Sequence, residues 1–318
     1  MKKALVFSLV LAIVASGLFA QEVAVVVKTG NSSFWQNVQT ACFDAQKDLK
    51  KMSAKFSVTF LGPQAETNIN EQINIVESAI DRGVKAIVLA PSDVKALIPV
   101  VKKAKAAGIP VVIIDSRLEG DASNYVSFLA TDGKAAGAAC AKDMIARLKA
   151  KGIESGKVAI ESYVAGAGSE IDRVGGFKDY LAKNSSFSVV STQYCNGDQV
   201  TALNQVTNTL ASNADLVGFY AANEPSAVGM GRAIAQAGLG GKIVAVGFDG
   251  NSVLAGFVKN GTLQSICVQS GYNMGFMGVK AAYDVSVGKK KVAAFIDTGF
   301  LVVTKENIDT QEAKNVLY

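Results

Sequence analysis

The chain has 318 residues, of which 49% are hydrophobic, and it carries 32 lysine and arginine side chains against 27 aspartates and glutamates. Without Lys2 and Lys3, which belong to the leader discussed next, 30 basic and 27 acidic side chains remain, and a net charge of +3 is too balanced to indicate a nucleic-acid partner. The sequence contains no histidine, which excludes a Ser-His-Asp triad within the chain and removes the commonest zinc and copper ligand. We therefore expect neither a metal site nor a cofactor.

The N-terminal 20 residues have the features of a secretory signal peptide. Lys2 and Lys3 form a short basic segment, and residues 4–20 are apolar or small apart from two serines. This run is somewhat short for a membrane span and no basic stop-transfer segment follows it, although an uncleaved anchor is the alternative. We predict cleavage after Ala20 and a periplasmic protein.

Behind the leader, short apolar runs alternate with amphipathic helical patterns. The runs are continuous rather than alternating, which is typical of parallel strands covered on both faces. The predicted strands are 23–27, 56–61, 86–90, 111–115, 126–130, 158–162, 189–194, 216–220, 243–247, 263–269 and 300–304. The predicted helices are 33–51, 70–82, a helix from near 99 to 107, 132–151, 170–183, 200–212, 225–237, 253–260 and 272–287.

Strands that alternate with helices form parallel sheets, and this number of strands fits two sheets better than one. The break falls near Thr131 and Asp132, where no proline- or serine-rich linker occurs. The sequence therefore predicts an α/β protein with two lobes. Ligands of open parallel sheets bind beyond the carboxyl ends of the strands, so the candidate residues are those that follow the strands.

Four cysteines occur, at Cys42, Cys140, Cys195 and Cys267, and none is part of a Cys-x-x-Cys pair. An exported protein can form disulfides, but sequence alone cannot choose among the possible pairings. All but Cys195 lie in apolar stretches, where a buried free thiol is commoner than a bridge.

Two adjacent aromatic residues, Phe34 and Trp35, follow the first predicted strand. An aromatic face packs well against the C–H groups of a sugar ring, while the sugar hydroxyls turn toward polar groups. We expect at least one of the two to contact a ligand; helix packing is the alternative.

Asp115 and Asp249 each end a predicted strand, one in either half of the chain. A carboxylate in this position can accept hydrogen bonds from two neighbouring hydroxyl groups, and such charge-assisted bonds are strong. The alternative is that each aspartate caps the following helix, which is common at strand–helix junctions.

Arg173 lies near the start of a predicted helix, where the helix dipole favours acidic residues. A guanidinium that donates to ligand oxygens would explain it, and an ion pair with Asp172 or Glu170 is the alternative. Asn223 and Gln269 also follow strands, and amides both donate and accept, as hydroxyl groups do.

These residues lie in seven segments that resemble, in order along nearly the whole mature chain, the periplasmic sugar-binding proteins of the ribose-binding type, which feed ABC importers. The segments are Asn31-Ser-Ser-Phe-Trp35, Ile109-Pro-Val-Val-Ile-Ile-Asp-Ser116, Ala130-Thr-Asp132, Gly168-Ser-Glu-Ile-Asp-Arg173, Phe219-Tyr-Ala-Ala-Asn-Glu224, Val246-Gly-Phe-Asp-Gly250 and Cys267-Val-Gln269.

The resemblance implies two similar α/β lobes, each a parallel sheet flanked by helices, joined by three hinge crossings near Thr131, Gln269 and Thr298. The N-terminal lobe would comprise 21–131 plus 270–297, and the C-terminal lobe 132–269 plus 298–318. The ligand-binding residues carried over by position are Phe34, Trp35, Asp115, Arg173, Asn223, Asp249 and Gln269.

Three departures put ribose itself in doubt. Ser32 stands where the ribose binders have an asparagine, and Ser116 stands where they have an arginine, with Arg117 one place late. Gly197 stands where they have an aromatic that closes over the sugar. Ser32, Ser116 and Arg117 remain possible ligand contacts, and Asp132, near a hinge, either contacts ligand or caps a helix.

We therefore predict a monomeric solute-binding protein without enzymatic activity that captures a pentose, hexose or related polyol and delivers it to an ABC importer. The alternatives are a nucleoside or furanosyl signal molecule as ligand, a role as a chemoreceptor ligand sensor, an enzyme on the same architecture, and a related transcription regulator. The lack of a histidine argues against the enzyme, and the leader stands where a regulator would have its helix-turn-helix.

Overall fold

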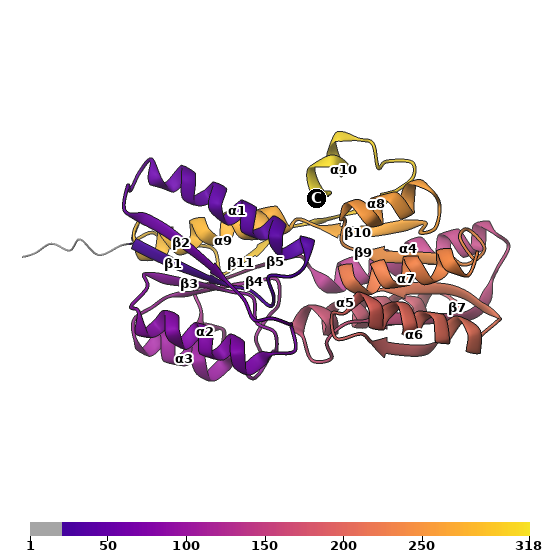
Figure 1. Cartoon of the computed structure of the whole chain (residues 1–318), viewed down its shortest axis with the longest axis horizontal. Coiled ribbons are helices and arrows are strands. Elements are labelled where there is room, and N and C mark those ends of the chain that lie inside the picture. The colour runs from indigo at the N-terminus through magenta and orange to yellow at the C-terminus, as the bar shows by residue number, and fades with distance from the viewer. Residues whose placement is uncertain (1–20) are drawn as a thin grey trace, which may run out of the picture.

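The computed structural model describes residues 21–318, and the predicted signal peptide lies outside this range. The described chain forms two lobes that lie side by side along the long axis of the molecule (Figure 1). Each lobe contains one six-stranded sheet with helices on both faces. The two-lobed α/β fold predicted from the sequence is confirmed.

The N-terminal lobe has the strand order β11-β5-β4-β3-β1-β2, and all neighbouring strands are parallel. Helices α1 and α9 cover one face of this sheet, and α2 and α3 cover the other (Figure 1). Its strands are β1 (Gln21–Val26), β2 (Phe56–Leu61), β3 (Ala86–Leu89), β4 (Val111–Ile114), β5 (Ser127–Ala130) and β11 (Phe295–Asp297). Its helices are α1 (Ser33–Lys50), α2 (Ile69–Asp81), α3 (Ile98–Ala106), the short 3-10 helix η1 (Ala122–Asn124) and α9 (Gly271–Ser286).

The C-terminal lobe repeats this arrangement with the strand order β12-β10-β9-β8-β6-β7, in which only β12 is antiparallel to its neighbour. Its strands are β6 (Ser155–Ser162), β7 (Ser186–Tyr194), β8 (Leu216–Ala221), β9 (Val244–Phe248), β10 (Ser265–Gln269) and β12 (Phe300–Thr304). Its helices are α4 (Gly133–Ala150), α5 (Gly168–Asn184), α6 (Gln199–Ser212), α7 (Glu224–Gln236), α8 (Ser252–Lys259) and α10 (Gln311–Val316).

The chain passes between the two sheets three times, between β5 and α4, between β10 and α9, and between β11 and β12. The first and third crossings lie side by side, because the Thr131 hydroxyl donates to the backbone carbonyl of Gly299 at 2.9 Å. The Thr131 and Thr298 hydroxyl oxygens are 3.5 Å apart. All three crossings are short.

Every predicted strand and helix overlaps an observed one, with ends that differ by at most three residues. The central strands β3, β4 and β9 are buried at every position, which is why they appear as continuous apolar runs. The prediction missed β11, η1 and α10, which are three to six residues long and too short to establish a period.

Close packing of α4 against α5 fixes the helix that carries Arg173. A Cβ atom at Gly137 in α4 would overlap the backbone carbonyl oxygen of Arg173, and one at Gly176 in α5 would overlap that of Lys134. Two glycines facing each other across the helix pair therefore allow the backbones to approach. This approach brings the start of α5 to the edge of the C-terminal sheet.

Cys42, Cys140, Cys195 and Cys267 are buried free thiols. Burial raises the pKa of the Cys195 thiol to about 12. Among residues 21–318, no helix has the length and apolar composition of a transmembrane span. A search of the same residues finds no group of three acidic, cysteine or histidine side chains placed to hold a metal ion.

Candidate functional site

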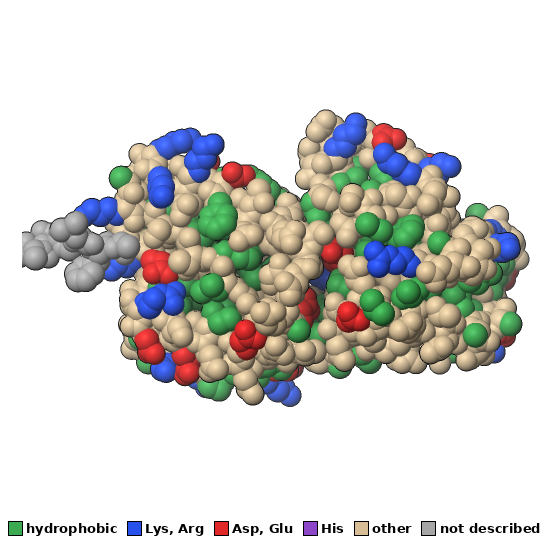
Figure 2. Space-filling model, in the orientation of Figure 1, with side chains coloured by type: hydrophobic (Ala, Val, Ile, Leu, Met, Phe, Trp, Pro, Cys, Tyr) green, Lys and Arg blue, Asp and Glu red, His purple; other side chains and the backbone are tan. Residues whose placement is uncertain are grey.

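A small cavity of about 20 Å³ lies between the lobes, beyond the carboxyl ends of the strands of both sheets. Figure 2 shows the seam between the lobes, with charged side chains set into it. The lining residues are Lys28, Ser32, Phe34, Trp35, Glu66, Asp115, Tyr163, Ser169, Arg173, Asn223, Glu224, Pro225, Asp249 and Gln269. All seven residues predicted by position, and the possible contact Ser32, are therefore brought together in one cavity.

Asp115 follows β4 directly and has a positive φ of 61°, a left-handed conformation that aspartate tolerates better than most residues. Its backbone N–H donates to the carbonyl of Leu129 at 3.0 Å, which holds the turn against β5. The side chain is buried and forms an ion pair with Lys28, with 2.6 Å between Nζ and Oδ2. The predicted alternative, that Asp115 caps a helix, is wrong because no helix begins there.

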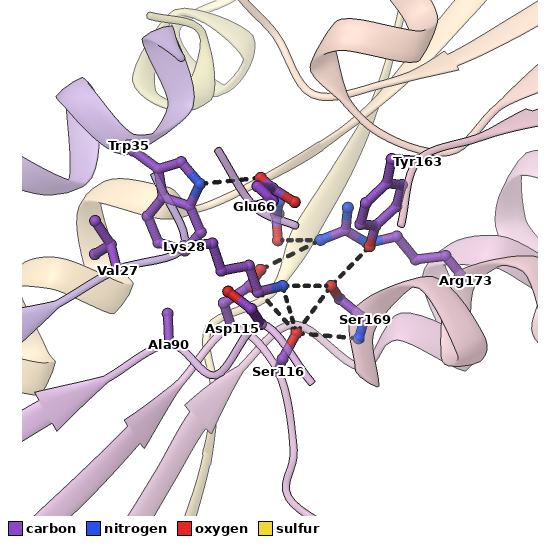
Figure 3. Close-up of polar contacts among 12 residues, drawn as sticks. Val27, Lys28, Trp35, Glu66, Ala90, Asp115, Ser116, Tyr163, Ser169 and Arg173 are labelled. Carbon is purple, nitrogen blue, oxygen red and sulfur yellow. Dashed lines mark hydrogen bonds and ion pairs between the residues drawn. The ribbon is translucent and has the colours of Figure 1, made fainter. Parts of the chain in front are cut away.

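Lys28, just after β1, is the centre of a buried polar cluster (Figure 3). Besides Asp115, its ammonium group contacts the hydroxyl oxygens of Ser116 at 2.6 Å and Ser169 at 3.1 Å. Ser169 belongs to α5, so this contact joins the lobes, and its hydroxyl is 2.7 Å from that of Tyr163. A buried ammonium is costly unless it is paired and hydrogen-bonded, and three oxygen partners meet that requirement.

These neighbours control the charge of Asp115. Burial acts to raise the pKa of its carboxyl, but the positive charges of Lys28 and then Arg173 outweigh it and the pKa is lowered. Asp115 is therefore held as a carboxylate, which can accept hydrogen bonds from ligand hydroxyls.

Asp249 occupies the corresponding place in the other lobe. It follows β9, has a φ of 72°, and donates its backbone N–H to the carbonyl of Cys267 at 2.9 Å. Its carboxyl accepts the Glu224 backbone N–H at 2.8 Å and the Gln269 side-chain amide at 2.8 Å. Burial raises the pKa of Asp249, and attraction to Arg173 offsets this only in part. Asn251, rather than Asp249, caps the helix that follows.

Arg173 is buried between the lobes, and the predicted alternative of an ion pair with Asp172 or Glu170 is wrong. Its guanidinium donates to the Ala222 carbonyl at 3.1 Å and to the Gln269 side-chain oxygen at 3.0 Å. It also lies 3.5 Å from the Asp115 carboxylate of the other lobe. Its charge lies over the ring of Phe248, 4.1 Å from the centroid, so one face of the guanidinium packs on an aromatic and its edge donates.

Asn223 is at once a helix cap and a cavity residue. Its side-chain oxygen accepts the Ser226 backbone N–H at 3.1 Å, and the Ser226 hydroxyl lies 3.0 Å from the Asn223 backbone N–H, which completes a capping box for α7. Because the oxygen is used in this way, the amide NH₂ is the group left to donate to a ligand.

The aromatic wall of the cavity comes from the start of α1. Phe34 and Trp35 pack edge to face with ring centroids 4.9 Å apart. Ser32 caps α1 by accepting the Trp35 backbone N–H at 3.3 Å. The Trp35 indole N–H donates to Glu66 Oε1 at 3.4 Å, which orients the ring. Both aromatics thus line the cavity, although they also pack in the core of the N-terminal lobe.

Glu224, the first residue of α7, connects the two lobes directly. Its carboxyl accepts the backbone N–H groups of Ser33 at 3.3 Å and Phe34 at 3.0 Å, at the N-terminus of α1 in the other lobe. The Tyr318 hydroxyl also donates to it at 3.2 Å. Burial, and then the nearby charge of Asp249, raise the pKa of Glu224 to about 7.

The other possible contacts lie outside the cavity. Ser116 lies behind Asp115, where its hydroxyl contacts Lys28 and accepts the Ser169 backbone N–H at 3.1 Å. Arg117 forms a partly exposed ion pair with Asp172 of the other lobe at 3.2 Å. Asp132 caps α4 by accepting the Ala135 backbone N–H at 3.0 Å, so the helix-capping alternative for this residue agrees with the structure.

The predicted ligand-binding residues do not include five polar residues that line the cavity, which are Lys28, Glu66, Tyr163, Ser169 and Glu224. Lys28 carried a usable signal, because a lysine directly after a fully apolar strand is placed to be buried. Glu66 carried none, because it lies in a loop of mixed composition. Chemically, the arrangement offers acceptors, donors and an aromatic wall, which suits a small polyhydroxylated ligand.

Comparison with known protein families and structures agrees with this geometry. The family described as "periplasmic binding protein domain" matches residues 23–290. The D-allose-binding periplasmic protein of Escherichia coli is 30% identical over 283 residues, which cover 87% of this chain and 88% of that protein.

Two solved structures are similar over almost their whole length. An ABC transporter solute-binding protein from Agrobacterium vitis, with bound D-fucose, is 56% identical and has a TM-score of 0.89, covering 93% of this chain and all of that one. A carbohydrate transporter solute-binding protein from Agrobacterium radiobacter, in complex with D-arabinose, is 36% identical with a TM-score of 0.90, covering 95% of this chain and all of that one.

Proposed function

Because this chain belongs to the periplasmic binding protein family, we propose that it captures a neutral monosaccharide between its lobes and presents the closed form to an ABC importer. The observation that carries this proposal is the cavity that both lobes line with hydroxyl-binding groups beside an aromatic wall.

The charges around the cavity favour a neutral ligand over an acidic one. Two cationic groups line the cavity, those of Lys28 and Arg173. Four carboxyl groups line it too, those of Glu66, Asp115, Glu224 and Asp249. Both cations are already engaged with protein oxygens, so a sugar acid or sugar phosphate would bring a further negative charge with no free partner.

D-Fucose is the first ligand to test, since the 56% identical Agrobacterium vitis protein holds it, and D-arabinose is the second. The D-allose of the Escherichia coli relative is a third candidate at lower identity. We infer a pentose, hexose or deoxyhexose ligand and do not single out ribose. Ser32 and Ser116 stand where the ribose binders have other residues, and here Ser32 caps α1 and Ser116 packs behind Asp115.

We infer that capture proceeds by hinge closure of a lobe formed by 21–131 plus 270–297 onto one formed by 132–269 plus 298–318. The contacts that support it are those made between lobes, from Glu224 to the start of α1 and from Arg173 to Asp115. A ligand that bridges Asp115 and Asp249 favours the closed state through contacts that the open state lacks. In this role the mature protein is periplasmic and carries out no reaction.

The test is thermal melting of residues 21–318 with D-fucose, D-arabinose, D-galactose, D-allose, D-ribose and a nucleoside. A ligand present at about 100 times its dissociation constant adds about 2.7 kcal/mol to the stability of the folded protein. We expect a clear rise in Tm with at least one sugar, and the same rise in Glu77→Gln, a surface control. A rise with the nucleoside alone, or with none of these compounds, would contradict the proposal.

A further inference from the structure

Glu66 lies on the loop between β2 and α2 and contributes its carboxyl group to the cavity wall beside Trp35. We propose that Glu66 is a specificity-determining residue, whose Oε2 atom accepts a hydrogen bond from one hydroxyl of the sugar. The inference rests on the proposed function and adds to it that the ligand carries a hydroxyl donor at this wall.

The two carboxyl oxygens of Glu66 differ in their partners. Oε1 accepts the indole N–H of Trp35 at 3.4 Å, which fixes the orientation of the carboxyl group (Figure 3). Oε2 is buried, and no donor within residues 21–318 reaches it. A buried acceptor left without a donor costs about 1–3 kcal/mol, and more when it is charged, so this atom gains from a ligand that supplies a donor.

Glu161 makes a useful contrast, because both of its carboxyl oxygens are also buried and lack a donor among the described residues. Glu161, however, lies inside β6 and borders none of the cavities found between the lobes. Burial raises its pKa to about 8, so it is mostly protonated near neutral pH and carries no charge for a ligand to offset. Glu66 differs because it lines the cavity between the lobes.

The opposite lobe leaves room for Glu66. Gly197 has a φ of 77°, and a Cβ atom built there would lie 4.0 Å from Glu66 Cγ. This distance is ordinary van der Waals contact, so Gly197 lies next to the stem of Glu66 and adds no side chain of its own to this wall. The missing side chain at Gly197 and the presence of Glu66 thus make this wall of the cavity polar.

Glu66 also stands between the cavity and a second hollow. Together with Ser32 and Pro225 it lines both the cavity and an outer hollow of about 450 Å³ that includes Gly197. A ligand hydroxyl bound to Oε2 therefore lies at the outer end of the site. A methyl or deoxy position pointing this way would leave Oε2 without a donor, whereas a hydroxyl satisfies it.

Proton linkage supplies a second readout. Burial raises the pKa of Glu66, against the attraction of Lys28, which lowers it. A hydroxyl that donates to the carboxylate favours its charged form, so sugar binding is expected to release protons where Glu66 is partly protonated. Calorimetry in buffers of different ionisation enthalpy measures this release.

The experiment is calorimetric titration of the wild type, Glu66→Ala, Glu66→Gln and the charge-matched surface control Glu77→Gln with D-fucose, D-arabinose and D-galactose. For the sugar that the wild type binds best, we expect Glu66→Ala to weaken binding about 10- to 100-fold. The control should stay within about twofold.

Monodeoxy analogues of the same sugar then identify the hydroxyl. For one analogue, the wild type and Glu66→Ala should have similar, weakened affinities. Removing the ligand hydroxyl and removing the Glu66 carboxyl delete the same hydrogen bond, so the two effects are not additive. Glu66→Gln preserves the shape of the side chain but can place an amide NH₂, which is a donor, where Oε2 accepts. If the alanine variant does not fold, this variant therefore tests the same hydrogen bond.

The two proposals fail in different ways. If the wild type binds a sugar but both Glu66 variants bind it within about threefold and no analogue shows coupling, the role of Glu66 is overturned while the proposed function stands. If the wild type binds no sugar, the proposed function fails, and the role of Glu66 with it.

Discussion

Asp115 and Asp249 occupy equivalent places in the two lobes and yet differ in their electrostatic surroundings. Each follows the fourth strand along its sheet from the equivalent edge, each has a positive φ, and each donates its N–H to the strand that comes next. Asp115, however, is paired with Lys28 and has a lowered pKa, whereas Asp249 is held by neutral donors and has a raised pKa.

The difference shows that repeating the backbone does not repeat the chemistry. The local geometry places a carboxylate at the same site in both lobes, because an Asp in the left-handed conformation ends the strand. What surrounds it comes from elsewhere, because Lys28, two residues after the end of β1, pairs with Asp115, whereas Asp249 accepts hydrogen bonds from Glu224 at the start of α7 and from Gln269. Asp115 is therefore held as a charged carboxylate, whereas the surroundings of Asp249 stabilise its charge less.

The largest expected effect separates the two acids. Asp115→Asn leaves Lys28 buried without its carboxylate, and breaking a buried pair costs about 3–5 kcal/mol, so Tm without ligand should fall by several degrees. Asp249→Asn removes a buried acid that forms no ion pair among the described residues and whose burial the attraction of Arg173 offsets only in part, so Tm should change little or rise. Both variants should bind sugar at least 100-fold more weakly, as measured by calorimetry.

Thermal melting without ligand decides the matter, with Glu77→Gln as the control for loss of one surface charge. Equal falls in Tm for both variants would show that the two acids are equivalent and that Lys28 does not distinguish them. Unchanged sugar affinity in either variant would remove that acid from the site.

The sequence was sufficient to place both acids and not their surroundings. A continuous apolar run ending in Asp determines a strand terminus, and the carboxyl ends of parallel strands share one edge, so Asp115 and Asp249 could be expected in the site. The same reasoning places Arg173, Asn223 and Gln269 there. It depends only on local pattern and on the regularity of parallel sheets.

The remaining site residues depend on contacts between distant segments. Lys28 meets Ser169 across 141 positions and Glu224 meets Phe34 across 190, and no local pattern records such pairs. Asp132 was left open between two roles because an N-cap and a ligand contact require the same residue type at the same junction. Only the lobe–lobe geometry separates them.

The second-largest expected effect is a pH dependence of sugar affinity caused by Glu224, which lies next to Asp249. Glu224 has a pKa of about 7 with the lobes in contact, above the ordinary value of 4.5 that an open cleft would restore. The closed state therefore binds the proton more tightly, so its advantage is fully present below about pH 4.5 and is lost as the pH rises to about 7. Sugar affinity should fall across this window by roughly tenfold or more.

Glu224→Gln cannot titrate, so the part of the pH dependence that it removes belongs to Glu224 and not to Asp249. We expect the ratio of wild-type to variant affinity to decline from pH 4.5 to pH 7 and to stay constant above that. A constant ratio throughout would mean that the contact of Glu224 with the start of α1 does not depend on its charge.

The smallest expected effect tests whether contacts between lobes matter in general or only where they are buried. Arg117 and Asp172 also join the lobes, but their ion pair is partly exposed and lies outside the cavity, so it is worth about 0–1 kcal/mol and weakens with salt. Arg117→Ala should therefore change sugar affinity by less than about fivefold at low salt and hardly at all at 0.5 M salt. A loss as large as that of Asp115→Asn would show that closure depends on this outer pair, and the contrast between the two buried acids would then explain little of the binding energy.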